Sequence, residues 1–502
     1  MISPSVADLE LLMPRHAPWL LALAALTGLR LWAAAVLPLS ADEAYYWTWS
    51  HALQPGYLDH PPMVALWMRA GCRIAGEGAL GLRLLGPLSA AAGSVLLMQA
   101  ADAVRPGAGV PAAALLNGTL LLGAGAVTMT PDTPLLFFWM LALWALSRVL
   151  LTGRGRWWLL AGAASGLGLC SKYTGGFLGV GIVLWLAWVP GLRRWFASPW
   201  LWAGGAVAAA LFAPVLAWNA GHGWVSLAKQ GGRAGDWNPG RALAHLGELL
   251  AGQAGLATPL VFVLLAAGIW AATRRAWRRD PAWSLLAAMI LPGLLVFVQH
   301  AVGDRVQANW PAILYPAAAA AAGAMALGGW AARWWRPAAA LGLLLTGAAT
   351  LQAAAAPLAL PRRLDPALIR LGGWDALARD AETLRAASGA GYLAAENYGV
   401  SSLLAWWAPG PVLAGDAPGE GPRWSLLRLP AAANGTMPGG PGLLLISQRH
   451  REPPDPAQWA AAEPLGELVR ARNGVEAERF RAYRATPQPG AAFVRLPTPE
   501  SR

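Results

Sequence analysis

Runs of apolar residues alternate with short polar segments along the chain as far as residue 357. A helix of about 20 residues crosses the hydrocarbon core of a bilayer, so each run predicts a transmembrane helix. The stretch between the basic residues at 154–156 and 193–194 is long enough for two short spans that turn at 171–176. Eleven spans are expected, the others at about 19–39, 79–101, 109–129, 134–151, 200–218, 256–272, 282–299, 310–330 and 337–357.

Arginine marks every second junction between these spans. Short cytoplasmic loops carry the excess of Lys and Arg, so the basic junctions predict the inner face and an N-terminus inside. These junctions contain Arg15, Arg105, Arg154, Arg156, Arg193, Arg194, Arg274, Arg275, Arg278, Arg279, Arg333 and Arg336. The opposite loops, at about 40–77, 130–133, 171–176, 219–250 and 300–309, are predicted to lie on the outer face.

The tail differs in character from the rest of the chain. Residues 360–502 carry more charge and contain no predicted span. Strands are expected at Leu443–Ile446 and Gly391–Ala395, and an amphipathic helix at Asp375–Ala387. The pattern therefore predicts an all-α polytopic membrane domain at 1–358 and a small α/β domain at 359–502, which an odd number of crossings places outside.

Composition supports this membrane assignment. Of the 502 residues, 56% are hydrophobic and 13% are charged, which is typical of a polytopic membrane protein. The net charge of +12 lies in the junctions between apolar runs, so it follows from topology and excludes a nucleic-acid partner. The first run lacks a clear small-residue cleavage site and predicts an uncleaved span. Only Cys72 and Cys170 are present, and their positions predict neither a disulfide nor redox chemistry.

One polar segment, SADEAYYWTWSHALQPGYLDHPPM at 40–63, lies between two strongly apolar stretches. It cannot lie in lipid, and it contains the pairs Asp42-Glu43 and Asp59-His60. Its aromatic residues are suited to stacking on a sugar ring or to the headgroup level. They are Tyr45, Tyr46, Trp47, Trp49 and Tyr57. We interpret this segment as half of an active site, followed by an interfacial helix at about 63–75.

Several segments taken together resemble bacterial members of the dolichyl-phosphate-mannose protein mannosyltransferase family, glycosyltransferase family 39. They are Asp42-Glu43, Asp59-His60-Pro61-Pro62, Thr130-Pro131-Asp132-Thr133-Pro134, Ser171-Lys172-Tyr173-Thr174 and Arg305-Val306-Gln307-Ala308-Asn309-Trp310-Pro311. The resemblance covers about residues 15–330. It implies a GT-C fold and kinship with the aminoarabinose and galacturonic acid transferases of lipid A. It also implies a multi-pass enzyme of the bacterial inner membrane, with its site and tail facing the periplasm. Such an enzyme transfers a sugar, with inversion, from a polyprenyl-phosphate carrier to lipid A, a glycan or a protein hydroxyl.

Asp42 is the candidate general base. Transfer to a hydroxyl requires that the hydroxyl lose its proton as an oxocarbenium-like centre develops, and a carboxylate at the membrane surface can accept that proton. In the family the Asp of the first-loop Asp-Glu pair has this role, and Asp42 occupies its position, with Glu43 beside it in the catalytic set. The alternative is that Asp42 caps a helix that starts at Glu43.

Asp132 is a second catalytic candidate. Prolines at 131 and 134 fix the backbone of a very short outer turn, so the carboxylate projects from the tips of two spans. It is expected to orient the acceptor or to share the work of the base. The alternative is capping at the start of the fourth span.

Cations near the outer boundary are candidates for binding the donor phosphate. Lys172 has this position, although a snorkelling lysine that marks the end of a span is the alternative. His60 is a candidate to bind the carrier phosphate or to protonate it as it departs, but aminoarabinose transferases commonly have Lys before the two prolines. The guanidinium of Arg305 suits bidentate phosphate contact. The other expected substrate contacts are Tyr45, Tyr57, Asp59, Tyr173 and Asn309.

The sequence leaves the sugar, the acceptor and a divalent metal ion open. The spacing of His222, His245 and His300 does not match a zinc site. A membrane transporter or lipid-linked sugar flippase is the alternative function, because it too would have about a dozen spans and ionisable residues at the boundary. A non-catalytic scaffold is a third. Ionisable residues gathered at one face favour the enzyme.

Overall fold

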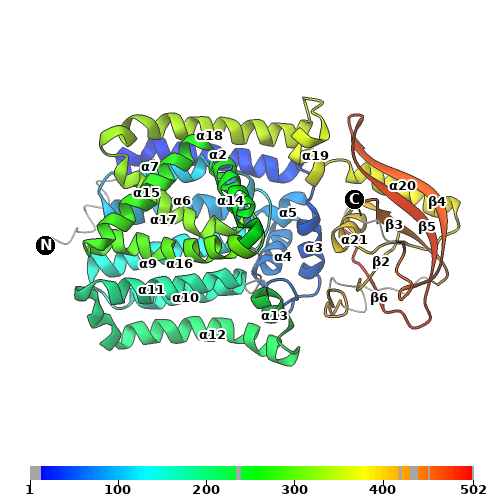
Figure 1. The fold of residues 1–502 in the computed structure, drawn as a ribbon, viewed down its shortest axis with the longest axis horizontal. Helices are drawn as coiled ribbons and strands as arrows, with labels where there is room; N and C mark the ends of the chain where they lie inside the picture. Colours follow the sequence, from blue (N-terminus) through cyan, green and yellow to red (C-terminus); the bar gives the residue numbers. More distant parts are fainter. Residues whose placement is uncertain (1–12, 233–238, 418–420, 430–438, 450–452, 500–502) are drawn as a thin grey trace. The chain divides into compact units, whose positions relative to one another are not determined.

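The structure is a computed structural model that describes residues 13–232, 239–417, 421–429, 439–449 and 453–499. The chain divides into two compact units (Figure 1). Unit 1 comprises Met1–Trp32, Asp59–Val64 and Leu85–Ala348, and unit 2 comprises Ala33–Leu58, Ala65–Leu84 and Ala349–Arg502.

The described part of unit 1 is built from helices joined by turns and loops, and contains no strand. Its elements are α2 (Met13–Val36, ending in unit 2), α6 (Leu85–Val104), α7 (Gly109–Asn117), α8 (Leu120–Gly125), α9 (Asp132–Thr152), α10 (Trp157–Ser171), η1 (Tyr173–Gly175), α11 (Gly176–Trp188), η2 (Pro190–Ala197), α12 (Pro199–Gly221), α13 (Val225–Gly232), η3 (Pro239–Arg241), α14 (Ala242–Ala257), α15 (Pro259–Trp277), α16 (Pro281–Gly303), η4 (Trp310–Leu314), α17 (Tyr315–Met325) and α18 (Gly329–Ala355, ending in unit 2).

Seven helices in the described part of the chain are long and apolar enough to cross a membrane. They are α2, α5 joined to α6, α9, α12, α15, α16 and α18. The chain is therefore a multi-pass membrane protein, as predicted. The other expected spans are found as shorter or broken helices, namely α7 with α8, α10, α11 with η2, and η4 with α17. The number eleven stays a prediction.

The breaks in these expected spans have local causes. α7 ends at Asn117, whose side-chain oxygen accepts from Arg30 Nη1 at 2.7 Å and whose amide donates to Ser94. Thr119 then caps α8, because its hydroxyl accepts from the backbone N–H of Leu122. The segment from η1 through α11 is bent by 119° against η2, where Pro190 has no backbone donor to continue the helix.

Small residues let helices of unit 1 approach closely, as is common between membrane helices. A Cβ on Gly162 of α10 would lie 2.0 Å from the carbonyl oxygen of Gly204 in α12. A Cβ on Gly342 of α18 would lie 1.8 Å from the carbonyl oxygen of Gly118. Figure 1 shows α9, α10 and α12 running side by side. Any larger residue at these glycines would force the backbones apart.

Unit 2 combines short helices with a sheet. Its helices are α3 (Ala41–Ser50), α4 (Met63–Ala75, beginning in unit 1), α5 (Ala79–Arg83), η5 (Arg362–Leu364), α19 (Pro366–Arg370), α20 (Trp374–Ala387) and α21 (Tyr398–Trp407). Its strands are β1 (Leu393–Ala395), β2 (Val412–Gly415), β3 (Gly442–Ser447), β4 (Trp459–Arg472), β5 (Val475–Pro487) and β6 (Phe493–Arg495).

In the described residues the strand order is β4-β5-β3-β1-β2-β6. β1 pairs in parallel with β2 and β3, and the other pairs are antiparallel. Leu444, Ile446 and Tyr392 form the centre of the sheet core. The expected strands at 391–395 and 443–446 and the expected helix at 375–387 are present, so the small α/β domain is confirmed.

Candidate active site

The polar segment at 40–63 is helical over much of its length, because a capping box starts α3. Ser40 Oγ accepts from the backbone N–H of Glu43 at 3.3 Å, and Ser40 N donates to Glu43 Oε2 at 3.0 Å. This reciprocal pair satisfies two donors that a helix start otherwise leaves without partners. Ser40, and not Asp42, is therefore the N-cap. The capping alternative for Asp42 is wrong.

Glu43 is fixed in the interior of unit 2. Its carboxylate accepts from Arg83 Nε at 2.6 Å and from Arg83 Nη2 at 2.8 Å, and both side chains are 0% exposed. Arg83 also donates to three carbonyl oxygens at and just beyond the end of α2, those of Ala34, Leu37 and Pro38. One buried guanidinium thus joins α5, α3 and the end of α2. These are the contacts of a structural residue, and they do not support the catalytic role expected for Glu43.

Asp42 faces the other way. Its side chain is exposed, one position before the buried Glu43. Its Oδ1 accepts from the hydroxyl of Tyr398 at 3.0 Å. A carboxylate in the first turn of a helix is also stabilised by the positive end of the helix dipole. The Asp42-Glu43 pair therefore divides into one carboxylate that anchors the helix and one that is presented to the surroundings.

The five aromatic residues of the segment form the packing that holds α3 in place. Tyr45, Tyr46, Trp47, Trp49 and Tyr57 are all buried. Trp49 and Tyr57 stack with ring centroids 4.1 Å apart, and the Tyr57 hydroxyl donates to the carbonyl oxygens of Ala52, at 3.0 Å, and Trp49. Burial raises the pKa of that hydroxyl above its ordinary value. These contacts favour a packing role for Tyr45 and Tyr57 over the expected contact with a sugar.

A second cluster lies in unit 1, where three of the predicted outer loops meet. Asp132 is the first residue of α9 and is 9% exposed. Lys172 Nζ donates to its two oxygens at 2.8 and 3.1 Å, and Asn309 Nδ2 donates to Oδ2 at 2.6 Å. Lys172 is 8% exposed, so this is a largely buried pair of charges. The structure thus brings together three residues that the sequence placed in separate motifs.

The other candidates in unit 1 contact partners from the 219–250 loop. Asp59 pairs with Lys229 Nζ at 2.8 Å, and Gln230 donates to the Asp59 carbonyl oxygen. The Tyr173 hydroxyl lies 2.8 Å from the Ser226 hydroxyl. His60 is half-buried next to Asp59. Asp59 and Tyr173 are thus both bound by side chains of α13, which lies within this predicted loop.

Arg305 differs from these residues. Its Nε donates to Glu248 at 2.8 Å, and its side chain is 68% exposed. Such an exposed ion pair is weak and easily exchanged, so it would not prevent Arg305 from reaching an anion.

Known proteins are similar to this chain in sequence and in fold. Residues 59–218 match the family model described as dolichyl-phosphate-mannose-protein mannosyltransferase. The chain is 30% identical over 301 residues to the lipid A galacturonosyltransferase RgtD of Rhizobium johnstonii, and the match covers 58% of this chain. The chain spans 62% of that relative's length.

Two solved structures have the same fold. ArnT from Cupriavidus metallidurans bound to undecaprenyl phosphate has a TM-score of 0.62 at 16% identity, covering 93% of this chain and 98% of ArnT. The apo state of that ArnT has a TM-score of 0.58 at 15% identity, covering 94% and 98%. The chain therefore has the GT-C fold of these ArnT structures.

This GT-C chain also contains site neighbours that sequence reasoning missed. Arg83, Tyr398, Lys229 and Ser226 all contact candidates, but each comes from another segment. Lys229 had a usable signal, because a lysine in a predicted outer loop is a natural partner for the acidic first loop. Arg83 had a weaker one, since an arginine at the start of an apolar run requires a buried counter-charge.

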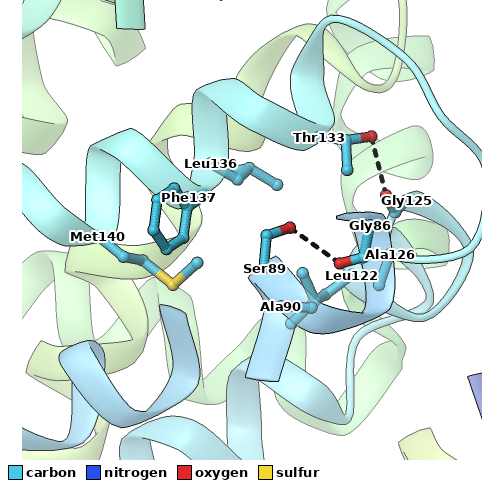
Figure 2. A pocket seen from close by; sticks show the side chains of 10 residues that line it. All are labelled: Gly86, Ser89, Ala90, Leu122, Gly125, Ala126, Thr133, Leu136, Phe137 and Met140. Carbon is cyan, nitrogen blue, oxygen red and sulfur yellow. Dashed lines mark hydrogen bonds between the residues drawn. The ribbon is translucent and has the colours of Figure 1, made fainter. Parts of the chain in front are cut away.

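A small pocket lies beside the first turn of α9, close to Asp132 in sequence. Figure 2 shows Thr133, Phe137 and Met140 of α9 facing Ser89 of α6 across it. The Thr133 hydroxyl donates to the Gly125 carbonyl oxygen at 3.1 Å. The cavity volume is about 10 Å³, which is room for about one water molecule and not for a sugar. Within the described residues, no group of three or more His, Cys, Asp or Glu side chains is placed to hold a metal ion.

Proposed function

We propose that this chain is an inverting glycosyltransferase of the bacterial inner membrane. It would move a sugar from a polyprenyl-phosphate carrier to an acceptor on the periplasmic side. The observation that supports the proposal most is the different environment of the adjacent residues Asp42 and Glu43. Glu43 fixes the helix through Arg83, so the backbone that presents the exposed Asp42 carboxylate is held in place. A general base requires this kind of fixed placement.

In the proposed reaction the acceptor oxygen attacks the anomeric carbon of the donor sugar. The new bond forms between these two atoms, and the bond from the anomeric carbon to the carrier phosphate oxygen breaks. The bonding electron pair stays on the phosphate, which leaves as polyprenyl phosphate. The proton of an acceptor hydroxyl passes to Asp42. Attack from the face opposite the leaving group inverts the anomeric centre.

The cluster at Asp132 is proposed to bind the departing phosphate through Lys172. An ammonium group has three N–H donors, and Asp132 accepts from Lys172 at 2.8 and 3.1 Å. We assign a further donor to a phosphate oxygen of the carrier. Asp132 and Asn309 would hold the ammonium in place, which gives Asp132 a positioning role, and the exposed Arg305 is the second candidate cation.

The relatives suggest the substrates. ArnT was solved with undecaprenyl phosphate bound, and RgtD is named as a lipid A galacturonosyltransferase. A long polyprenyl-phosphate donor and a glycolipid acceptor of the lipid A type are therefore the first choices here, followed by a glycan or a protein hydroxyl. Because a phosphate acceptor is already an anion near pH 7, it would need less help from Asp42 than a hydroxyl would. The names of these relatives give the transporter hypothesis no support.

The test uses the purified full chain in lipid nanodiscs with a panel of radiolabelled polyprenyl-phosphate sugars and lipid A acceptors. We expect free polyprenyl phosphate to appear only when donor and acceptor are both present. Asp42→Asn should lower the rate by about 10²–10⁴-fold, the usual contribution of a general base. The matched control is Asp380→Asn, which removes an exposed carboxylate from α20 and should leave the rate unchanged.

Two results would refute the proposal at different levels. If no sugar of the panel is transferred, the chain is not this kind of transferase. If sugar is transferred and folded Asp42→Asn is as fast as Asp380→Asn, the base has been assigned to the wrong residue. Mass spectrometry of envelope glycolipids from a deletion strain would identify the product.

A further inference from the structure

We infer that Tyr398 is a positioning residue for Asp42, so that the C-terminal part of the chain completes the site of the base. The inference rests on the proposed function, because it assigns Tyr398 a role in that reaction. It depends on the hydrogen bond that the Tyr398 hydroxyl donates to Asp42 Oδ1 at 3.0 Å. The two residues are 356 positions apart, and both belong to unit 2.

The starts of two helices are held together at this point. Asn397 caps α21 by accepting from the backbone N–H groups of Gly399 and Val400 at 3.0 and 3.2 Å. Gly399 packs so tightly on Ala41, the first residue of α3, that a Cβ on it would lie 2.7 Å from the Ala41 Cβ. Tyr398 and Asp42 are the neighbours of these two contact residues. The close approach of the helices therefore sets the distance between hydroxyl and carboxylate.

A second contact between α3 and α21 prevents the two helices from rotating against each other. Trp47 of α3 and Trp406 of α21 meet edge to face, with ring centroids 5.0 Å apart. Both are buried. Two separated contacts, one at the helix starts and one near the end of α21, fix the relative orientation of the helices. The hydrogen bond between Tyr398 and Asp42 at the helix starts is therefore already in place before substrate binds, so little entropy is lost on binding.

Two neighbours contact the ring of Tyr398. Its centroid lies 4.7 Å from that of Tyr45, and Arg423 Cζ lies 4.3 Å from it. The same guanidinium lies 5.7 Å from the Tyr45 ring. A cation over the face of a phenol draws electron density from the ring and makes its hydroxyl a better hydrogen-bond donor. Arg423 thus strengthens the bond that Tyr398 donates to Asp42.

This arrangement suits a base that must be ionised and correctly oriented before the acceptor arrives. A hydrogen bond to a carboxylate favours its charged form. It also fixes the plane of the group, while the two oxygens together offer about four sites for donors. Asp42 can therefore accept from Tyr398 and from an acceptor hydroxyl at the same time. Tyr398 itself exchanges no proton in the reaction.

The decisive variant is Tyr398→Phe, which removes the hydroxyl and keeps the ring in contact with Tyr45 and Arg423. Acceptor-dependent release of polyprenyl phosphate is measured across pH in nanodiscs. We expect kcat to fall about 10-fold, as for the loss of a hydrogen bond to a charged group, with the KM for the donor unchanged. The acid limb of the pH–rate profile should move to higher pH, because the charged form of Asp42 has lost a donor.

The matched control is Tyr392→Phe. The Tyr392 hydroxyl is buried in the sheet core of unit 2 and makes no hydrogen bond within the described residues. This variant should keep the wild-type rate and pH profile. Partial misfolding of Tyr398→Phe would lower its rate but would not move the position of the acid limb. Arg423 lies outside α3 and α21, and Arg423→Gln should move the acid limb in the same direction by a smaller amount.

The outcomes separate the two claims. If Asp42→Asn is inactive but Tyr398→Phe matches Tyr392→Phe in kcat and in pH profile, the inference about Tyr398 is overturned and the proposed function stands. A fall in kcat with an unmoved acid limb would also overturn it, since a merely structural tyrosine behaves in that way. If the wild-type chain transfers no sugar, both the function and the inference fail.

Discussion

The ion pair between Asp132 and Lys172 gives a prediction in which one double variant recovers stability but not activity. Both side chains are about nine-tenths buried. Removing one member of a buried ion pair leaves the other charge without compensation and costs about 3–5 kcal/mol. Asp132→Asn and Lys172→Met should each lose stability of this size. The double variant should recover most of it, because two neutral side chains of similar volume replace the pair at little net cost.

The natural cysteines provide the assay. Cys170 is 6% exposed and lies two residues before Lys172, so a thiol-reactive dye reaches it only when this region opens. Cys72→Ser removes the signal of the half-buried second thiol. The temperature at which Cys170 reacts is then measured in detergent for four proteins in this background: the parent, Asp132→Asn, Lys172→Met and the double variant. Arg305 and Glu248 form the matched exposed pair, for which changes within the ~0–1 kcal/mol of surface pairs are expected.

Activity should follow a different pattern. The double variant lacks the ammonium that we assign to the carrier phosphate, so it should stay at least 10-fold below wild type in kcat/KM for the donor even when its stability has recovered. Donor turnover at the wild-type level in the stable double variant would refute the phosphate-binding role of Lys172. Single variants as stable as wild type would refute the argument that the pair is buried and coupled.

Three further predictions concern unit 2 and its location. Glu43→Gln should lower thermal stability, by about 3–5 kcal/mol because it leaves Arg83 buried without its counter-charge, and the remaining folded enzyme should keep its pH profile. Burial opposes the ionisation of Asp365, but hydrogen bonds from Leu368 and Gln352 together with Arg472 outweigh it and lower its pKa. The stability that this gives is present above the unfolded pKa and is lost as pH falls through the folded pKa. Acid unfolding of Asp365→Asn should therefore be less steep than that of the wild type below about pH 4. Asp380→Cys in a Cys72→Ser background should react with a membrane-impermeant maleimide in intact cells whose outer membrane has been permeabilised, and protection until the inner membrane is lysed would place the tail inside.

The sequence carried enough information for the elements that depend on local patterns. The length of apolar runs predicted the long helices, and Ser40 with Glu43 three residues later is a capping box that can be read directly from the chain. The hairpin of β4 and β5 was also readable, although it was missed. Asn473 and Gly474 both have positive φ, at 50° and 76°, and Asn-Gly is the preferred pair for such a turn.

The candidate site was harder to predict, because its contacts join distant segments. The motifs at 130–134, 171–174 and 305–311 identified Asp132, Lys172 and Asn309, but their mutual hydrogen bonds depend on how three spans pack. Which carboxylate of Asp42-Glu43 is buried depends on Arg83, which lies 40 residues further along the chain. Composition alone treats the two as equivalent. The aromatic residues misled for the same reason, since Trp and Tyr suit a sugar site and a packed core equally well.

The contrast between Asp42 and Glu43 explains why a membrane transferase would keep two adjacent carboxylates at one helix start. A base at the membrane surface needs a support that does not move, yet it must itself stay accessible. The chain meets both needs with consecutive residues, because neighbours on a helix point about 100° apart. Glu43 turns inward to the buried Arg83, and Asp42 turns outward to Tyr398. We therefore infer that the tail, which supplies Tyr398, belongs to the catalytic apparatus and is not merely an appended domain.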